Sequence, residues 1–151
     1  GSSSGFKYPL VNLVKAGIEP ERDFAEIFYV GNHDAVANSV ARRQVAAGAI
    51  WDLELKNAEK IHGKIFRTLA TTSPIPREAW IAQKSMSTDL ITSIRKALIT
   101  LTPDTTLKSG KPVFPQKSAF NGFVVESEAF YNVVGETSAI VQNYLEKYPA
   151  R

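Results

Sequence analysis

The most informative segment of the sequence is SSSGFKYPLVNLVKAG, residues 2–17. Clustered hydroxyls precede a predicted helix, and the first-turn N–H groups of a helix lack intrahelical acceptors while their dipoles point the same way. Such groups together are typical of a turn that receives a phosphate-like anion. A flexible Gly/Ser linker over residues 1–5 is the alternative interpretation. This segment alone does not separate the two.

The composition is that of a globular protein with a sizeable core. At 151 residues and 44% hydrophobic residues, the chain fits one domain better than two. Its 18 basic and 15 acidic residues leave a formal charge of +3, and the basic residues are scattered between acids, which argues against a nucleic-acid partner. The positive balance helps to attract small anions, although a solvated mixed-sign surface explains it as well.

The chain has no cysteine, which excludes zinc–thiolate sites, disulfides and cysteine nucleophiles. Its two histidines, His33 and His62, do not form a close-spaced metal pair, so we expect no metal and no cofactor. The sequence has no apolar run long enough to span a bilayer and no signal peptide before the domain. If the protein is exported, its signal has been removed or left out.

Apolar periodicity predicts helices that alternate with short β-rich runs in the first half of the chain, which indicates an α/β fold. A polar stretch with three prolines, residues 102–122, predicts a long irregular connection. The expected strands are residues 27–30, 46–50, 65–71 and 79–82. The expected helices are residues 10–17, 32–45, 53–61, 87–101, 126–131 and 136–148.

Three groups of residues lie where ligands gather in an open α/β sheet, at strand carboxyl ends and helix amino ends. They are residues 2–5, residues 32–34 after the first strand, and Trp51 with Asp52 after the second. Each group also has a structural interpretation, because residues 32–34 and Asp52 are good helix caps and Trp51 suits a core. Taken one at a time, the structural interpretation is favoured.

The order of these groups resembles a known family. The segments SSSGFKYP (residues 2–9) and KAGIEPERDF (15–24) are similar to the S-T-S-G…Y-P…KAGIDPEKDF region of phosphonate/phosphite substrate-binding proteins of ABC importers. The segments GNHDA (31–35) and VAAGAIWD (45–52) look like the next two blocks of that family. Two later segments also resemble it, SPIP (73–76) and FV (123–124). Each motif is modest, but their order and spacing together are fairly specific.

The resemblance implies two α/β lobes that a hinge joins and that close over the ligand. Residues 1–101 would form one lobe of a type II periplasmic-binding-protein fold, a mixed sheet flanked by helices. Residues 102–151 would form a helical and irregular C-terminal segment that packs back on the first lobe, most of which this chain lacks. A truncated chain, a proteolytic fragment and a natural single-lobe protein all fit this length. The absent lobe also leaves room for a dimer or a swapped assembly.

The resemblance further implies a ligand-binding site. The serines would donate to phosphonate oxygens through hydroxyls and nearby N–H groups, and His33 would add a donor, because desolvating an oxyanion requires several aligned donors. Asp52 would pair with an amine on the ligand, or Trp51 would form an apolar wall for a different substituent. The implied ligand-binding residues are Ser2, Ser3, Ser4, Gly5, His33, Trp51 and Asp52.

Solute capture for an ABC importer is therefore the expected function. A small phosphorus-containing anion would bind between the lobes, and the closed form would dock to a membrane permease in the periplasm or another extracytoplasmic space. A ligand-sensing module of a signalling protein with the same fold is the alternative. An enzyme is disfavoured. Ser4, His33 and Asp34 have the residue types of a nucleophile, a base and an orienting acid, but no nucleophile-elbow pattern surrounds Ser4.

Overall fold

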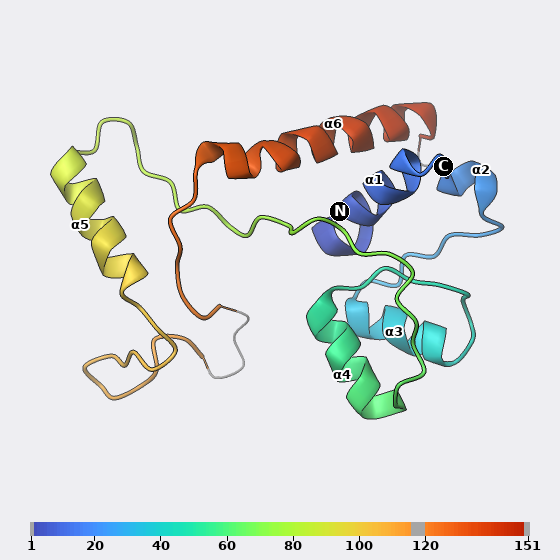
Figure 1. Ribbon diagram of the computed structural model, residues 1–151, viewed down its shortest axis with the longest axis horizontal. Coiled ribbons are helices and arrows are strands. Elements are labelled where there is room, and N and C mark those ends of the chain that lie inside the picture. The colour runs from blue at the N-terminus through green and yellow to red at the C-terminus, as the bar shows by residue number, and fades with distance from the viewer. Residues whose placement is uncertain (1, 116–119, 150–151) are drawn as a thin grey trace. The chain divides into compact units, whose positions relative to one another are not determined.

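The computed structural model describes residues 2–115 and 120–149, which form helices joined by long extended segments (Figure 1). The π-helical turn η1 runs directly into α1, and the 16-residue α6 is the last element. The elements in chain order are η1 (Ser3–Lys7), α1 (Tyr8–Lys15), α2 (Pro20–Asp23), α3 (His33–Ala41), α4 (Asp52–His62), α5 (Thr88–Ile99), η2 (Glu128–Tyr131) and α6 (Asn132–Lys147).

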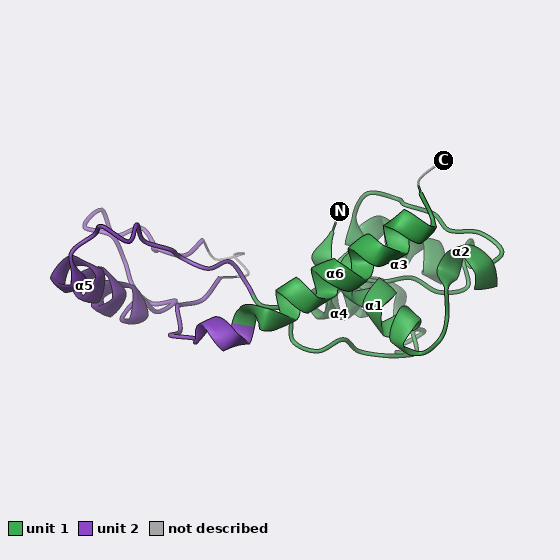
Figure 2. Ribbon diagram, turned by 90° about the horizontal axis from the view of Figure 1, so that it is seen from above, with its two compact units in different colours: residues 1–76, 131–151 green, residues 77–130 purple. Residues whose placement is uncertain are grey.

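The chain divides into two compact units (Figure 2). Unit 1 comprises residues 1–76 and 131–151, and unit 2 comprises residues 77–130. Unit 1 therefore contains η1, the helices α1 to α4 and α6, whereas unit 2 contains α5. The expected lobe boundary between residues 101 and 102 stays a prediction.

The predicted α/β lobe with a mixed sheet is wrong for the described residues. They contain no strand, and one isolated antiparallel bridge joins Thr106 to Pro112. The β-rich composition of the expected strands favours an extended backbone, but a strand is stable only when a neighbour completes its hydrogen bonds. Here the side chains stay in solvent, since Tyr29 is 72% exposed and Leu69 is 69% exposed. The segments that are extended or irregular instead of paired are residues 27–30, 46–50, 65–71 and 79–82.

The core of unit 1 forms where α6 lies along α1 (Figure 1). Leu10 and Val11 of α1 pack with Val141 and Tyr144 of α6, and each of the four is at most 6% exposed. Val141 and Tyr144 are three residues apart, so they lie on one face of their helix. Burying a side chain of this size contributes roughly 1.5–3 kcal/mol, so this contact is the main source of stability in unit 1.

The second helix pair of unit 1 consists of α3 and α4, which meet at two alanines. Ala37 and Ala58 are each 2% exposed, so the two backbones approach closely. The loop between the helices also approaches α3 closely, because a side chain at Gly48 would overlap Val36. A hydrogen bond of 2.8 Å joins His62 Nε2 to Asn38 Oδ1. This packing fixes the positions at which α3 and α4 begin.

A polar clasp ties the α2 turn to the end of α6; it consists of Glu19 and Glu21 with Tyr144, Lys147 and Tyr148. Lys147 Nζ donates to both carboxylate oxygens of Glu19, at 2.8 and 2.7 Å, and the Tyr148 hydroxyl donates to the same carboxylate. The Tyr144 hydroxyl accepts from the Glu21 N–H at 3.1 Å and donates to the Glu21 carboxylate. The Lys147 and Tyr148 donors lower the pKa of Glu19. Burial and the Glu21 acceptor raise the pKa of Tyr144 to about 12.

Unit 2 contains α5 and a group of aromatic rings. Ser87 caps α5, because its Oγ accepts from the Leu90 N–H at 3.3 Å. The Phe123 ring contacts both Trp80 and Phe114, with ring centroids 5.2 and 6.2 Å apart. None of the described residues in unit 2 is buried. In place of a buried core, the described part of unit 2 has contacts between aromatic rings.

Candidate ligand-binding site

The serine-rich turn is an ordered helix start. The Ser2 Oγ caps η1 by accepting from the Gly5 N–H at 3.0 Å, and the Lys7 N–H donates to the Ser2 carbonyl at 3.0 Å. The turn continues without a break into α1 at Tyr8. Ser2 and Ser3 are exposed, whereas Ser4 is half-buried. The hydroxyls therefore stand at the positive end of a continuous helical segment.

His33 approaches this turn from a distant part of the sequence. Its Nε2 lies 3.2 Å from the Ser4 Oγ, across a separation of 29 residues, and either atom is the donor according to the tautomer of the imidazole. His33 is the first residue of α3, which Asn32 caps by accepting from the Ala35 N–H at 2.7 Å. Two helix amino ends thus meet at the contact between Ser4 and His33.

Gly5 makes this approach possible. A Cβ at position 5 would lie 3.2 Å from the Ser2 Oγ and 3.4 Å from the His33 Cε1. The first distance is tighter than ordinary packing, so a side chain would displace the Ser2 cap. The glycine therefore has a role in the shape of the turn.

Trp51 contacts the same histidine, His33, through its ring. The rings of His33 and Trp51 stack with their centroids 5.7 Å apart and their planes 19° apart. Trp51 is the residue that precedes α4, and Asp52 is the first residue of that helix. Asp52 is exposed, and its carboxylate has no hydrogen bond or ion pair within the described residues. The structure thus brings Ser4, His33 and Trp51 together and leaves Asp52 exposed, outside these contacts.

Tyr8 and Asn12 are polar residues of this region to which the sequence patterns assigned no role in binding. Asn12 Nδ2 donates to the Thr71 carbonyl at 3.1 Å, which holds the extended segment 65–71 against α1. Tyr8 is 6% exposed, and its hydroxyl is buried without a hydrogen-bond partner in the described chain. The available signal was their spacing, since residues 4, 8 and 12 share one face of a helix.

The arrangement does not have the geometry of a catalytic triad. The Asp34 Oδ1 accepts from the Asn38 Nδ2 at 3.0 Å, within α3. The carboxylate is therefore engaged on its own helix, and among residues 2–115 and 120–149 the histidine has no acidic orienting partner. What the site offers is a set of hydroxyl, imidazole and N–H groups at convergent helix amino ends, a chemistry suited to holding an oxyanion.

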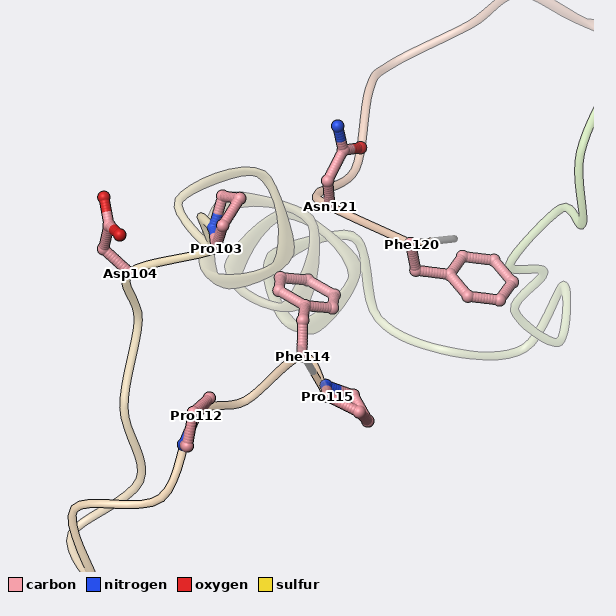
Figure 3. A pocket seen from close by; sticks show the side chains of 7 residues that line it. All are labelled: Pro103, Asp104, Pro112, Phe114, Pro115, Phe120 and Asn121. Atoms are coloured by element: carbon pink, nitrogen blue, oxygen red, sulfur yellow. The ribbon is translucent and has the colours of Figure 1, made fainter. Parts of the chain in front are cut away.

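A separate pocket of about 650 Å³ lies within unit 2. Figure 3 shows the Phe114 ring in the middle of the lining residues. The lining is mostly proline and phenylalanine, and its polar side chains are Asp104 and Asn121. A carboxylate repels an oxyanion, so this pocket does not suit a phosphate-like ligand.

The described residues contain neither a metal-binding cluster nor a membrane-spanning helix. Within residues 2–115 and 120–149, no group of three or more histidine or acidic residues is placed to hold a metal ion. None of the helices in that part of the chain combines the length and the apolar character that a membrane crossing requires.

A comparison with known families agrees with the resemblance in the sequence. The family model of the ABC transporter, phosphonate, periplasmic substrate-binding protein matches residues 1–131, which include every element up to η2. No solved structure matches the chain. The family is a substrate-binding component of transport systems, and its members work with an ABC permease. On the strength of this match, the chain belongs to the phosphonate-binding periplasmic substrate-binding proteins of ABC transporters.

Proposed function

We propose that this chain captures a phosphonate, phosphite or similar phosphorus oxyanion for an ABC importer. The observation that carries the proposal is the 3.2 Å contact between Ser4 and His33, because it joins the amino ends of two helices at one point. Hydroxyl, imidazole and N–H donors satisfy a tetrahedral oxyanion without a covalent step. The role is capture and delivery, not catalysis.

The seven residues of the predicted site divide into four roles in this proposal. The serines with Gly5 form the cradle, and His33 is the donor from the second helix. Trp51 supplies a flat apolar wall that fits an organic substituent on phosphorus. Asp52 stands one residue further along, at the exposed start of α4, where it supports recognition of a ligand amine. The ligand-binding residues of the proposal are Ser2, Ser3, Ser4, Gly5, His33, Trp51 and Asp52.

Calorimetric titration of the chain tests the proposal. Methylphosphonate, 2-aminoethylphosphonate, phosphite, phosphate and sulfate are compared, and at least one phosphorus oxyanion is expected to bind saturably. Ser4→Ala is expected to weaken that binding by about tenfold or more, because a donor to a charged oxygen is lost. Ser93→Ala is the matched control, since its hydroxyl donates to the Asp89 carbonyl at 2.8 Å in unit 2. No binding of any phosphorus oxyanion would contradict the proposal.

The partner and the place of action follow from the same family. We place the chain in the periplasm, with its ligand-bound form docking to a membrane permease. Self-association as a dimer or a swapped assembly stays a prediction, and light scattering of the chain in solution tests it.

A further inference from the structure

A buried hydroxyl in unit 1 has no hydrogen-bond partner within the described residues. It belongs to Tyr8, the first residue of α1, whose side chain is 6% exposed. Buried hydroxyls almost always have a hydrogen-bond partner, because a buried hydroxyl without one loses its hydrogen bonds to water and gains none in exchange. A phenylalanine, which has no hydroxyl, would fill this position without that cost, so the presence of a tyrosine here needs an explanation.

The position of Tyr8 on the helix points toward the candidate ligand-binding site. η1 and α1 form one continuous helical segment, on which residues 4, 8 and 12 share a face. Both neighbours on this face make polar contacts, Ser4 with His33 at 3.2 Å and Asn12 with the Thr71 carbonyl at 3.1 Å. Tyr8 therefore belongs to a polar face that contacts α3 and the segment 65–71.

Tyr8 is buried outside the apolar cluster that α1 forms with α6. The apolar cluster with α6 contains Leu10 and Val11 from α1 and does not include Tyr8. Side chains on a helix also lean toward its N-terminus, so each covers the turn before its own Cα. The Tyr8 ring consequently leans toward the turn that carries Ser4. Its hydroxyl is buried.

We propose that the Tyr8 hydroxyl is the innermost donor of the oxyanion site and binds an oxygen of the bound ligand. The proposal rests on the function proposed above and adds a specificity-determining residue to it. A phosphonate group has three terminal oxygens, so an oxygen directed inward toward Tyr8 leaves two for Ser4, His33 and the turn. A planar carboxylate has only two oxygens and would not satisfy both sets of donors.

The experiment compares Tyr8→Phe with the wild-type chain in titrations with methylphosphonate and with acetate. Loss of one donor to a charged oxygen is expected to weaken methylphosphonate binding by about tenfold or more. The unliganded variant is expected to melt at the same or a higher temperature, because no protein partner loses a hydrogen bond. Tyr29→Phe is the matched control, since Tyr29 is 72% exposed and its ring contact with Phe6 needs no hydroxyl.

The outcomes separate the two proposals. If no phosphorus oxyanion binds the wild-type chain, the proposed function itself fails. If Ser4→Ala loses affinity while Tyr8→Phe binds methylphosphonate as tightly as the wild type, only the role of Tyr8 is overturned. A lower melting temperature of unliganded Tyr8→Phe together with unchanged affinity also overturns it, because the hydroxyl then serves the fold alone.

Discussion

Units 1 and 2 differ in what holds their helices. In unit 1, α1 and α6 bury Leu10, Val11, Val141 and Tyr144 against one another. In unit 2, α5 is just as amphipathic in sequence, yet its Leu90 remains 50% exposed. The comparison teaches that an apolar helical face predicts a helix but not its burial, since burial requires a second face to pack on.

A consequence for stability follows from this difference. A helix of 12 residues such as α5 is marginal in water without tertiary packing, even with a good N-cap. We therefore expect unit 2 to open at a small free-energy cost while unit 1 remains folded. Matched substitutions in the two units test this expectation.

The largest expected effect comes from truncating the same residue type in each unit. Leu10→Ala removes a side chain that is 4% exposed and is expected to destabilise unit 1 by about 2–4 kcal/mol. Leu90→Ala alters a half-exposed position and is expected to cost less than about 1 kcal/mol. Urea denaturation followed by circular dichroism measures both. Equal losses in the two variants would show that the units share one cooperative core.

The next effect concerns the clasp between α2 and α6. Tyr144→Phe removes a hydroxyl that accepts from the Glu21 N–H and donates to the Glu21 carboxylate. The loss of hydrogen bonds to a charged group is expected to cost unit 1 about 1–2 kcal/mol. Denaturation midpoints of the variant and the wild type provide the measurement, and a loss of α5 helicity alone would contradict the assignment of the clasp to unit 1.

The clasp also predicts how stability changes in alkali. The pKa of Tyr144 is raised from 10.0 to about 12 in the folded chain, so the folded state holds this proton more tightly than the unfolded state does. Stability from this group is fully present below pH 10 and is lost as the pH rises toward 12. Tyr144→Phe should therefore show a flatter decline over this window, and an equal decline in both proteins would count against the raised pKa.

A smaller effect is expected from one exposed alanine in each of the two helices. Ala139→Gly in α6 and Ala97→Gly in α5 both lower helix propensity by about 1 kcal/mol. Ala139→Gly should lower the unfolding midpoint of unit 1, because α6 forms part of the core. Ala97→Gly should lower the helical signal without moving that midpoint. A midpoint shift of the same size in both variants would contradict separate stabilities.

Most of the longer helices could be predicted from the sequence, because their signals are local. Ser87 precedes α5 as its N-cap, and the predicted helix 53–61 corresponds to α4, Asp52–His62. The expected strands are wrong: residues 65–71 have β-forming composition, but a strand forms only if a neighbour elsewhere in the chain pairs with it, and none of the described residues does. The β-rich run 79–82 fails for the same reason.

The candidate site could be predicted in part, again because its motifs are local in the sequence. The motifs SSSG (residues 2–5) and GNHDA (31–35) single out Ser4 and His33, and the structure places them 3.2 Å apart. Ligand binding by these residues stays a prediction. Tyr8 stands in the Y-P pair of the family motif but has no role assigned by it, and its interest comes from a buried hydroxyl that only tertiary structure reveals. The clasp is equally hidden in the sequence, since Glu19 and Lys147 are 128 residues apart.

The smallest expected effect is on the acid side and again separates the units. Donors from Lys147 and Tyr148 lower the pKa of Glu19 from 4.5, so the folded state releases this proton more readily than the unfolded state. Stability from Glu19 is present above pH 4.5 and is lost as the pH falls through its lowered value. Glu19→Gln should therefore weaken the acid-induced loss of unit 1 stability, and Glu126→Gln in unit 2 is the control.

In Glu19→Gln the acid-induced loss of unit 1 stability should become smaller but should not disappear, because a second carboxyl in the same turn remains. Arg22 holds the pKa of Asp23 at about 2, so Asp23 still releases its proton more readily in the folded state. Denaturation midpoints of Glu19→Gln and of the wild type, measured from pH 5 to pH 2, separate the contribution of Glu19 from that of Asp23. Identical acid profiles for Glu19→Gln and the wild type would mean that the ion pair with Lys147 is solvated in solution, and the clasp would then rest on Tyr144 alone.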